Sequence, residues 1–110
     1  MPSIPMTLHE EHEQIDRAIW QAILALLPDH WSSAALSVST ESRIDSGLAH
    51  SIENLDGEND ICIPSDEIFV LTAEHYDSFR RHGSPWREVI WSVRYDFDDE
   101  KWKCLTDIKY

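Results

Sequence analysis

The segment 86–110 constrains the fold more than any other part of the chain. Within it, β-branched and aromatic residues, with one cysteine at position 104, fall on every second position in two runs, 89–97 and 102–110. A period of two is typical of antiparallel strands that bury one face. Three acidic residues, at 98–100, separate the runs. The segment therefore predicts a β-hairpin with one wide aromatic face, which needs a large element packed against it.

Two amphipathic helices are predicted to cover this face. The first extends from about Thr7 to Leu27, where a capping-box pattern begins it and Pro28 ends it. The second follows Ser65, an N-cap residue with acidic residues in the turn after it, and Gly83 suits the position just beyond its end. Residues 69–71 also suit the extension of a strand, which would move the start of this helix by several residues. Both show apolar residues at helical spacing, so each is expected to bury one side.

The region between the helices predicts two or three shorter strands. Residues 33–40 alternate between apolar and hydroxyl-bearing side chains, residues 44–52 alternate more weakly, and residues 61–63 suit a short third strand. The expected order of elements is α-β-β-(β)-α-β-β. We therefore predict a single α+β domain over residues 1–110, with two helices packed on one face of an antiparallel sheet of four to five strands.

The charge balance is the outlier of the composition. Nine Lys and Arg face 21 Asp and Glu, which gives a formal net charge of −12. Such a surface repels nucleic acid and anionic membranes and attracts basic proteins. An excess of acid also keeps a small protein in solution, and composition alone does not decide between these interpretations.

The cellular location is predicted from what the sequence lacks. The N-terminus has no basic and apolar segments typical of a secretory signal, and the longest apolar run, 22–27, is far shorter than the roughly 20 residues of a membrane span. We therefore expect a cytoplasmic protein. In that reducing compartment, Cys62 and Cys104 are expected to be two buried thiols.

The sequence offers one weak candidate for a metal site and none for a nucleophile. His9, His12 and Asp16 share one side of the first predicted helix, a spacing at which a metal could be held. The simpler interpretation is a solvated helix start, because glutamates surround them. No serine or cysteine lies in a recognisable nucleophile motif, and no glycine-rich phosphate loop is present. We expect no catalytic residues, no cofactor, no metal, and a protein that is not an enzyme.

The distribution of acids favours a docking surface. Between Arg43 and Arg80 there is no Lys or Arg, whereas nine Asp and Glu lie there. Unneutralised acids on loops repel one another and stabilise nothing within a monomer. An ordinary solvated surface is the alternative. The candidate contacts to a basic partner are the acids expected on loops and element ends: Asp56, Glu58, Asp60, Asp66, Glu67, Asp98, Asp99 and Glu100.

Several short blocks carry a resemblance to a known family. The segment Leu26–Trp31, which reads LLPDHW, follows an amphipathic helix and precedes a strand of small residues. This arrangement resembles the I-P-x-x-W segment of the YezG-like antitoxin family. Tyr76 and Phe79 on a helix, and then Pro85 before a strand pair that ends at Tyr110, are similar to the second half of that family. The blocks cover most of the chain in the same order.

The resemblance implies a function in binding. Members of the family are cytoplasmic immunity proteins that neutralise the toxin domains of bacterial polymorphic toxin systems, including contact-dependent growth inhibition. It implies a cognate toxin as partner, often a nuclease, and no catalytic residues. We expect the toxin to be basic and the chain to be a monomer or weak dimer. The segment 44–52 departs from the aromatic-rich second strand expected of the family. An adaptor or regulatory module that binds another basic protein is the alternative.

Overall fold

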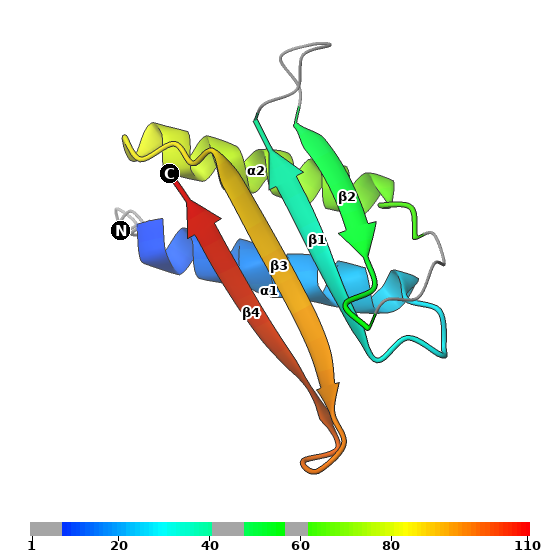
Figure 1. Ribbon diagram of the computed structural model, residues 1–110. Helices are drawn as coiled ribbons and strands as arrows, with labels where there is room; N and C mark the ends of the chain where they lie inside the picture. The colour runs from blue at the N-terminus through cyan, green and yellow to red at the C-terminus, as the bar shows by residue number, and fades with distance from the viewer. Residues whose placement is uncertain (1–7, 41–47, 57–61) are drawn as a thin grey trace.

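A computed structural model describes residues 8–40, 48–56 and 62–110 (Figure 1). The strands form one antiparallel sheet, and both helices lie on the same face of it. The predicted α+β class and the predicted position of the helices are confirmed. The elements and their bounds are α1, Leu8–Leu26; β1, Ser33–Ser39; β2, Ala49–Glu53; α2, Asp66–Arg81; β3, Glu88–Asp96; and β4, Lys101–Lys109.

The strand order in the sheet is β2-β1-β3-β4. The predicted hairpin consists of β3 and β4, while β1 pairs with β3 across the long connection that contains β2 and α2. Leu36 of β1 lies opposite Trp91 of β3 on one side and Ile52 of β2 on the other. These three side chains are buried beneath the helices. The core therefore lies between the central strands and the helix layer.

The second helix begins and ends where the sequence predicts. The hydroxyl of Ser65 accepts a hydrogen bond from the backbone N–H of Ile68 at 3.3 Å, as an N-cap does. Beyond the helix, Gly83 has a φ of 78°, a left-handed conformation that glycine adopts without strain. This turn lets the N–H of Ser84 donate to the carbonyl of Phe79 at 2.9 Å. Neither described helix is long and apolar enough to cross a membrane.

The optional third strand at 61–63 begins at a position outside the described residues, and Cys62 makes an isolated bridge with Ile52. The sheet of the described residues has four strands, within the predicted four to five. One expectation from the sequence is wrong, namely that both cysteines are buried. Cys62 is buried as expected, but Cys104 is exposed because it lies on the outermost strand. Two further predictions lie outside the described residues: the helix cap at Thr7 and positions 44–47 of the second strand.

The β3–β4 hairpin extends past the helix layer, and its turn has no helix over it (Figure 1). β4 forms one edge of the sheet. Charged side chains on an exposed edge disfavour pairing with a further strand. The edge strand carries all three lysines of the chain: Lys101, Lys103 and Lys109.

Candidate functional site

The end of the β3–β4 hairpin gathers three of the predicted contact residues on one exposed turn. Asp98, Asp99 and Glu100 connect the strands, and all three are exposed. The turn is held by Asp96, whose Oδ1 accepts the backbone N–H groups of Asp98 at 2.9 Å and Asp99 at 3.1 Å. The bonds from Asp99 and Asp98 lower the pKa of the Asp96 carboxyl. Asp96 thus fixes the turn backbone, and the three carboxylates after it face solvent.

The three carboxylates of this turn differ in their partners. Asp99 lies 2.7 Å from Nζ of Lys103, so part of its charge is already compensated. The side chains of Asp98 and Glu100 have no partner among residues 8–40, 48–56 and 62–110. Glu100 also has a φ of 52°, a left-handed conformation that completes the tight turn. Two of the three predicted contacts therefore remain available to another molecule.

Asp56 has partners within the chain, although the sequence predicts an acid that is not neutralised. Its Oδ2 accepts hydrogen bonds from the hydroxyls of Ser33 at 2.8 Å and Ser32 at 2.9 Å, and its Oδ1 lies 3.4 Å from Nη1 of Arg94. The bonds from Ser33 and Ser32, followed by the charge of Arg94, lower the pKa of the Asp56 carboxyl. Asp56 joins the start of β1 to the end of β3, so it stabilises the monomer.

The remaining predicted contacts are not brought to the hairpin end. Asp66 and Glu67 lie exposed in the first turn of α2, where the positive end of the helix dipole favours acids. That position gives them a structural role that needs no partner protein. Glu58 and Asp60 lie outside the described residues.

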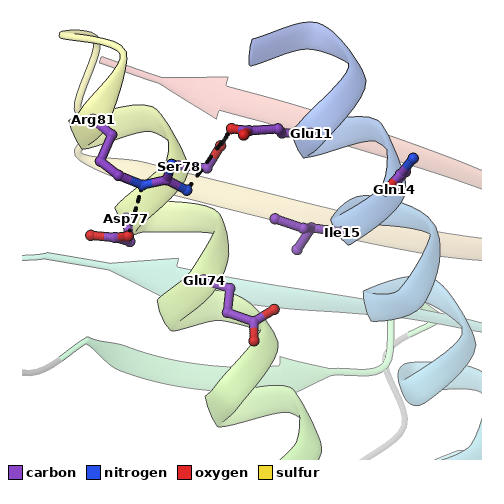
Figure 2. Close-up of a pocket in the computed structure, with 7 residues that line it drawn as sticks. All are labelled: Glu11, Gln14, Ile15, Glu74, Asp77, Ser78 and Arg81. Atoms are coloured by element: carbon purple, nitrogen blue, oxygen red, sulfur yellow. Dashed lines mark hydrogen bonds and ion pairs between the residues drawn. The ribbon is translucent and has the colours of Figure 1, made fainter. Parts of the chain in front are cut away.

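A second candidate is the groove between α1 and α2, which Figure 2 shows with its lining side chains. It has a volume of about 230 Å³. Glu11 reaches into it from α1; its Oε2 accepts a hydrogen bond from the hydroxyl of Ser78 at 2.6 Å and lies 3.0 Å from Nε2 of His82. These bonds from Ser78 and His82 lower the pKa of the Glu11 carboxyl. On the α2 side, Arg81 pairs with Asp77 at 3.0 Å.

Glu11 and Ser78 of the groove meet His82, which lies beside it, but the three residues are not arranged as a nucleophile with its base. The hydroxyl of Ser78 donates to Glu11, and His82 contacts the same carboxylate rather than the serine. A reactive serine needs a base that accepts its proton, and a carboxylate with a lowered pKa is a poor base. The contacts therefore tie α1 to α2, and the groove shows no assembled hydrolytic site among its described residues.

A buried polar cluster joins both helices to the sheet, centred on the Asp16 carboxylate of α1, which is 3% exposed. Its Oδ1 accepts a hydrogen bond from Nε1 of Trp91 at 2.6 Å. The same oxygen lies 2.9 Å from Nε2 of His75 on α2, although that ring is not aligned for a hydrogen bond. Oδ2 lies 2.9 Å from Nδ1 of His12. Nε1 of Trp86 donates to the far side of the His75 ring, at Nδ1, over 3.0 Å.

The protonation state of Asp16 follows from two opposing effects. Burial raises the pKa of Asp16, because a carboxylate loses hydration in the core. The polar contacts with His75, Trp91 and His12 outweigh burial and hold the pKa of Asp16 below its ordinary value of 3.8. The carboxylate is therefore ionised at neutral pH. The expected solvated helix face is wrong for Asp16, which lies in the core.

The same cluster is the strongest candidate for a metal site among the described residues. The ligand atoms of His12, Asp16 and His75 lie within 4.8 Å of one another. However, Trp86 donates its N–H to Nδ1 of His75, which places the proton of the neutral ring on Nε2, the atom that faces Asp16. A metal bound at Nε2 would require a ring with no proton at all. The cluster is therefore a hydrogen-bonded core network rather than a metal centre.

Comparison with known proteins adds no family to this description. No protein-family model matches the chain, and no curated protein matches its sequence. Of the sites described, only the hairpin end combines exposed carboxylates that lack partners in the described chain with a position that projects from the body of the domain.

Proposed function

We propose that this chain is an immunity protein, which binds a cognate bacterial toxin domain and neutralises it through the acidic end of the β3–β4 hairpin. The observation that carries the proposal is the pair of exposed carboxylates, Asp98 and Glu100, on a projecting turn of a chain with a net charge of −12. The resemblance of the segment Leu26–Trp31 to the YezG-like antitoxin family supports the same function. The toxin that fits this surface best is a basic nuclease.

The proposed mechanism uses charge in two ways. A strongly acidic protein attracts a basic one over a distance, which speeds their encounter. At contact, Asp98 and Glu100 occupy the places of nucleic-acid phosphates against the Lys and Arg side chains of the toxin. Because the turn is already fixed by Asp96, little conformational entropy is lost when it binds. The chain inhibits by occupying the toxin and needs no chemistry of its own.

The proposal is tested by co-expressing this chain with the toxin domain encoded beside its gene. We expect the cells to survive and the two proteins to purify as a stable complex. The double variant D98K/E100K is expected to weaken the complex roughly ten-fold, chiefly by speeding dissociation, because the direct contacts at the turn are lost. Dissociation constants at increasing salt provide the second measurement, because an electrostatic contact weakens as charges are screened.

A matched control separates local contact from overall charge. The variant E74K/D107K makes the same change in net charge at two exposed acids on α2 and at the other end of β4. Neither has a partner among the described residues. We expect the control to bind the toxin nearly as tightly as the wild type. Equal weakening by both variants would remove the hairpin end as the contact. Failure of the wild type to protect cells or form a complex would overturn the immunity function and favour an adaptor for another basic protein.

A further inference from the structure

Beside the acidic turn lies an open aromatic cavity of about 400 Å³, which we call the cradle. Two separate segments form it: the loop before β1, and the end of the β3–β4 hairpin. The loop supplies Asp29, His30, Trp31 and Ser32, and the hairpin supplies Tyr95, Phe97 and Trp102. This size is at the small end of the range for ligand sites and suits one side chain of a partner.

The two segments of the cradle are joined by backbone hydrogen bonds. The N–H of Tyr95 donates to the carbonyl of Ser32 at 2.8 Å, which fixes the hairpin against the loop. Within the loop, the N–H of Trp31 donates to the carbonyl of Pro28 at 3.0 Å. Tyr95 and Trp102 are paired across the hairpin, with ring centroids 5.5 Å apart. The cradle is therefore pre-formed in the free protein.

The rings of the cradle differ in exposure: the loop ring is buried, whereas the ring at the end of the hairpin is exposed to solvent. Trp31 is only 3% exposed, whereas Phe97 is 73% exposed. Phe97 packs edge-on against Tyr95, with centroids 5.0 Å apart and planes at 81°. A phenylalanine at the end of a hairpin leaves most of its apolar area in water, which stabilises the monomer little. Exposed aromatic side chains of this kind are typical of contact residues in protein interfaces.

We infer that the cradle receives an arginine side chain of the basic partner, an inference that rests on the proposed function. Two features of the chemistry select a cation. Aromatic ring faces attract positive charge, and Phe97 is followed directly by the exposed carboxylates of the acidic turn, Asp98 and Glu100. Asp29 lines the cavity itself and has no partner among the described residues. A planar guanidinium stacks on a ring and is more weakly hydrated than an ammonium group, so arginine fits better than lysine.

The same charges disfavour the other occupants of an aromatic cavity. A second copy of this chain would bring two acidic turns together, in molecules that each carry a net charge of −12. A purely apolar side chain would leave Asp29 and the carboxylates of the turn without a counter-charge at the edge of a drier interface. Only a cation satisfies both the rings and the carboxylates.

The cradle is tested with short peptides on the isolated, full-length chain. The probes are three acetylated and amidated peptides of alternating glycine and one other residue: arginine, lysine, or the neutral arginine analogue citrulline. The ¹⁵N-labelled chain is titrated with each, and the tryptophan indole N–H signals are followed by NMR. We expect the arginine peptide to shift the Trp102 signal saturably and to bind about three-fold to five-fold more tightly than the lysine peptide. The citrulline peptide is expected to bind least.

A pair of variants locates the binding. F97A removes the most exposed ring of the cradle, whereas L105A removes a comparably exposed apolar side chain (67%) from β4 outside it. We expect F97A to reduce binding of the arginine peptide to the level of the lysine peptide, and L105A to leave it unchanged. Equal binding of arginine and lysine peptides, or unchanged binding by F97A, would overturn the inference.

The same variants distinguish this inference from the proposed function. If the wild type and F97A protect cells from the toxin equally and bind it with equal affinity, the immunity function stands and the cradle is not its contact. If the chain binds the arginine peptide through Phe97 but neither protects cells nor binds the toxin, the cradle stands as a site for a basic protein and the immunity function fails.

Discussion

The buried cluster around Asp16 and the exposed end of the β3–β4 hairpin are built from similar residues but face opposite environments. The cluster places one carboxylate, and the hairpin end places several, beside aromatic side chains. In the cluster, Asp16 is contacted by Trp91, His75 and His12 within the chain. At the hairpin end, Asp98 and Glu100 have no partner among the described residues.

The difference in partners separates the acids that stabilise the fold from the acids that are available for binding. A buried carboxylate loses hydration and must recover it from donors inside the fold, so its partners are fixed when the chain folds. An exposed carboxylate stays hydrated in the free protein, and a partner protein can later replace the bound water with its own hydrogen-bond donors. Asp56 lies between these cases, because it is exposed and yet joins β1 to β3 through Ser32, Ser33 and Arg94. Residue type therefore does not decide the role of an acid here, whereas its partners do.

Removing the central carboxylate of the cluster should have the largest effect on stability. We expect D16A to lower the free energy of unfolding by about 3–5 kcal/mol, because it leaves the indole N–H of Trp91 and the ring of His75 buried without their counterpart. Urea unfolding followed by tryptophan fluorescence measures the change. D107A, at an exposed acid of β4, is the control and should resemble the wild type. A D16A variant as stable as D107A would show that the cluster is not central to the fold.

The two tryptophans of the cluster should differ, because one donates to a charged group and the other to a neutral one. We expect W91F to cost about 2 kcal/mol through the bond lost to the Asp16 carboxylate. W86F loses a bond to a neutral His75 ring and should cost about 1 kcal/mol. Both side chains are at most 2% exposed and lose the same atoms, so each variant controls for the packing of the other. Equal losses would argue that packing, rather than the charge on Asp16, determines stability here.

Acid should lower the stability that the buried cluster contributes to the fold. Because the pKa of Asp16 is lower in the folded than in the unfolded protein, the unfolded state takes up a proton first as the pH falls. The stability that Asp16 contributes is therefore present above the ordinary value of 3.8 and is lost as the pH falls below it, through the folded-state pKa. Unfolding midpoints across this range should fall less steeply for D16N than for the wild type. Parallel curves would show that other carboxyls with lowered pKa values, such as Asp56 and Asp77, account for the acid sensitivity.

The sequence predicts the elements of this fold because their signals are local. The alternation over 89–97 and 102–110 locates β3 and β4, and Pro28, Ser65 and Gly83 locate helix ends. Each of these signals acts within a few residues. The pairing of β1 with β3 is not local, and no short pattern indicates it.

The functional features depend on contacts between distant segments, so the sequence predicts them only in part. Helical spacing places His75 on the same side of α2 as Thr72 and Phe79, which are also buried, but its contact with Asp16 depends on how α1 packs on α2. The exposure of Cys104 depends on β4 being the outer strand. The acidic turn was predictable because its three acids follow directly on a strand, whereas the cradle requires the loop at 29–32 to meet the hairpin.

Charge reversal at the hairpin end should have the smallest effect on stability, in contrast to the loss of Asp16. D98K/E100K removes no partner of a described residue and reduces repulsion among the acids of the turn, so the urea midpoint should stay the same or rise slightly. The same variant should weaken toxin binding roughly ten-fold. An opposite pattern, with lost stability and unchanged binding, would mean that these carboxylates serve the fold as Asp16 does. Lower stability together with weaker binding would show that the turn has a structural role and that its loss disturbs the cradle. The binding affinity of F97A would then test the contact in place of the charge reversal.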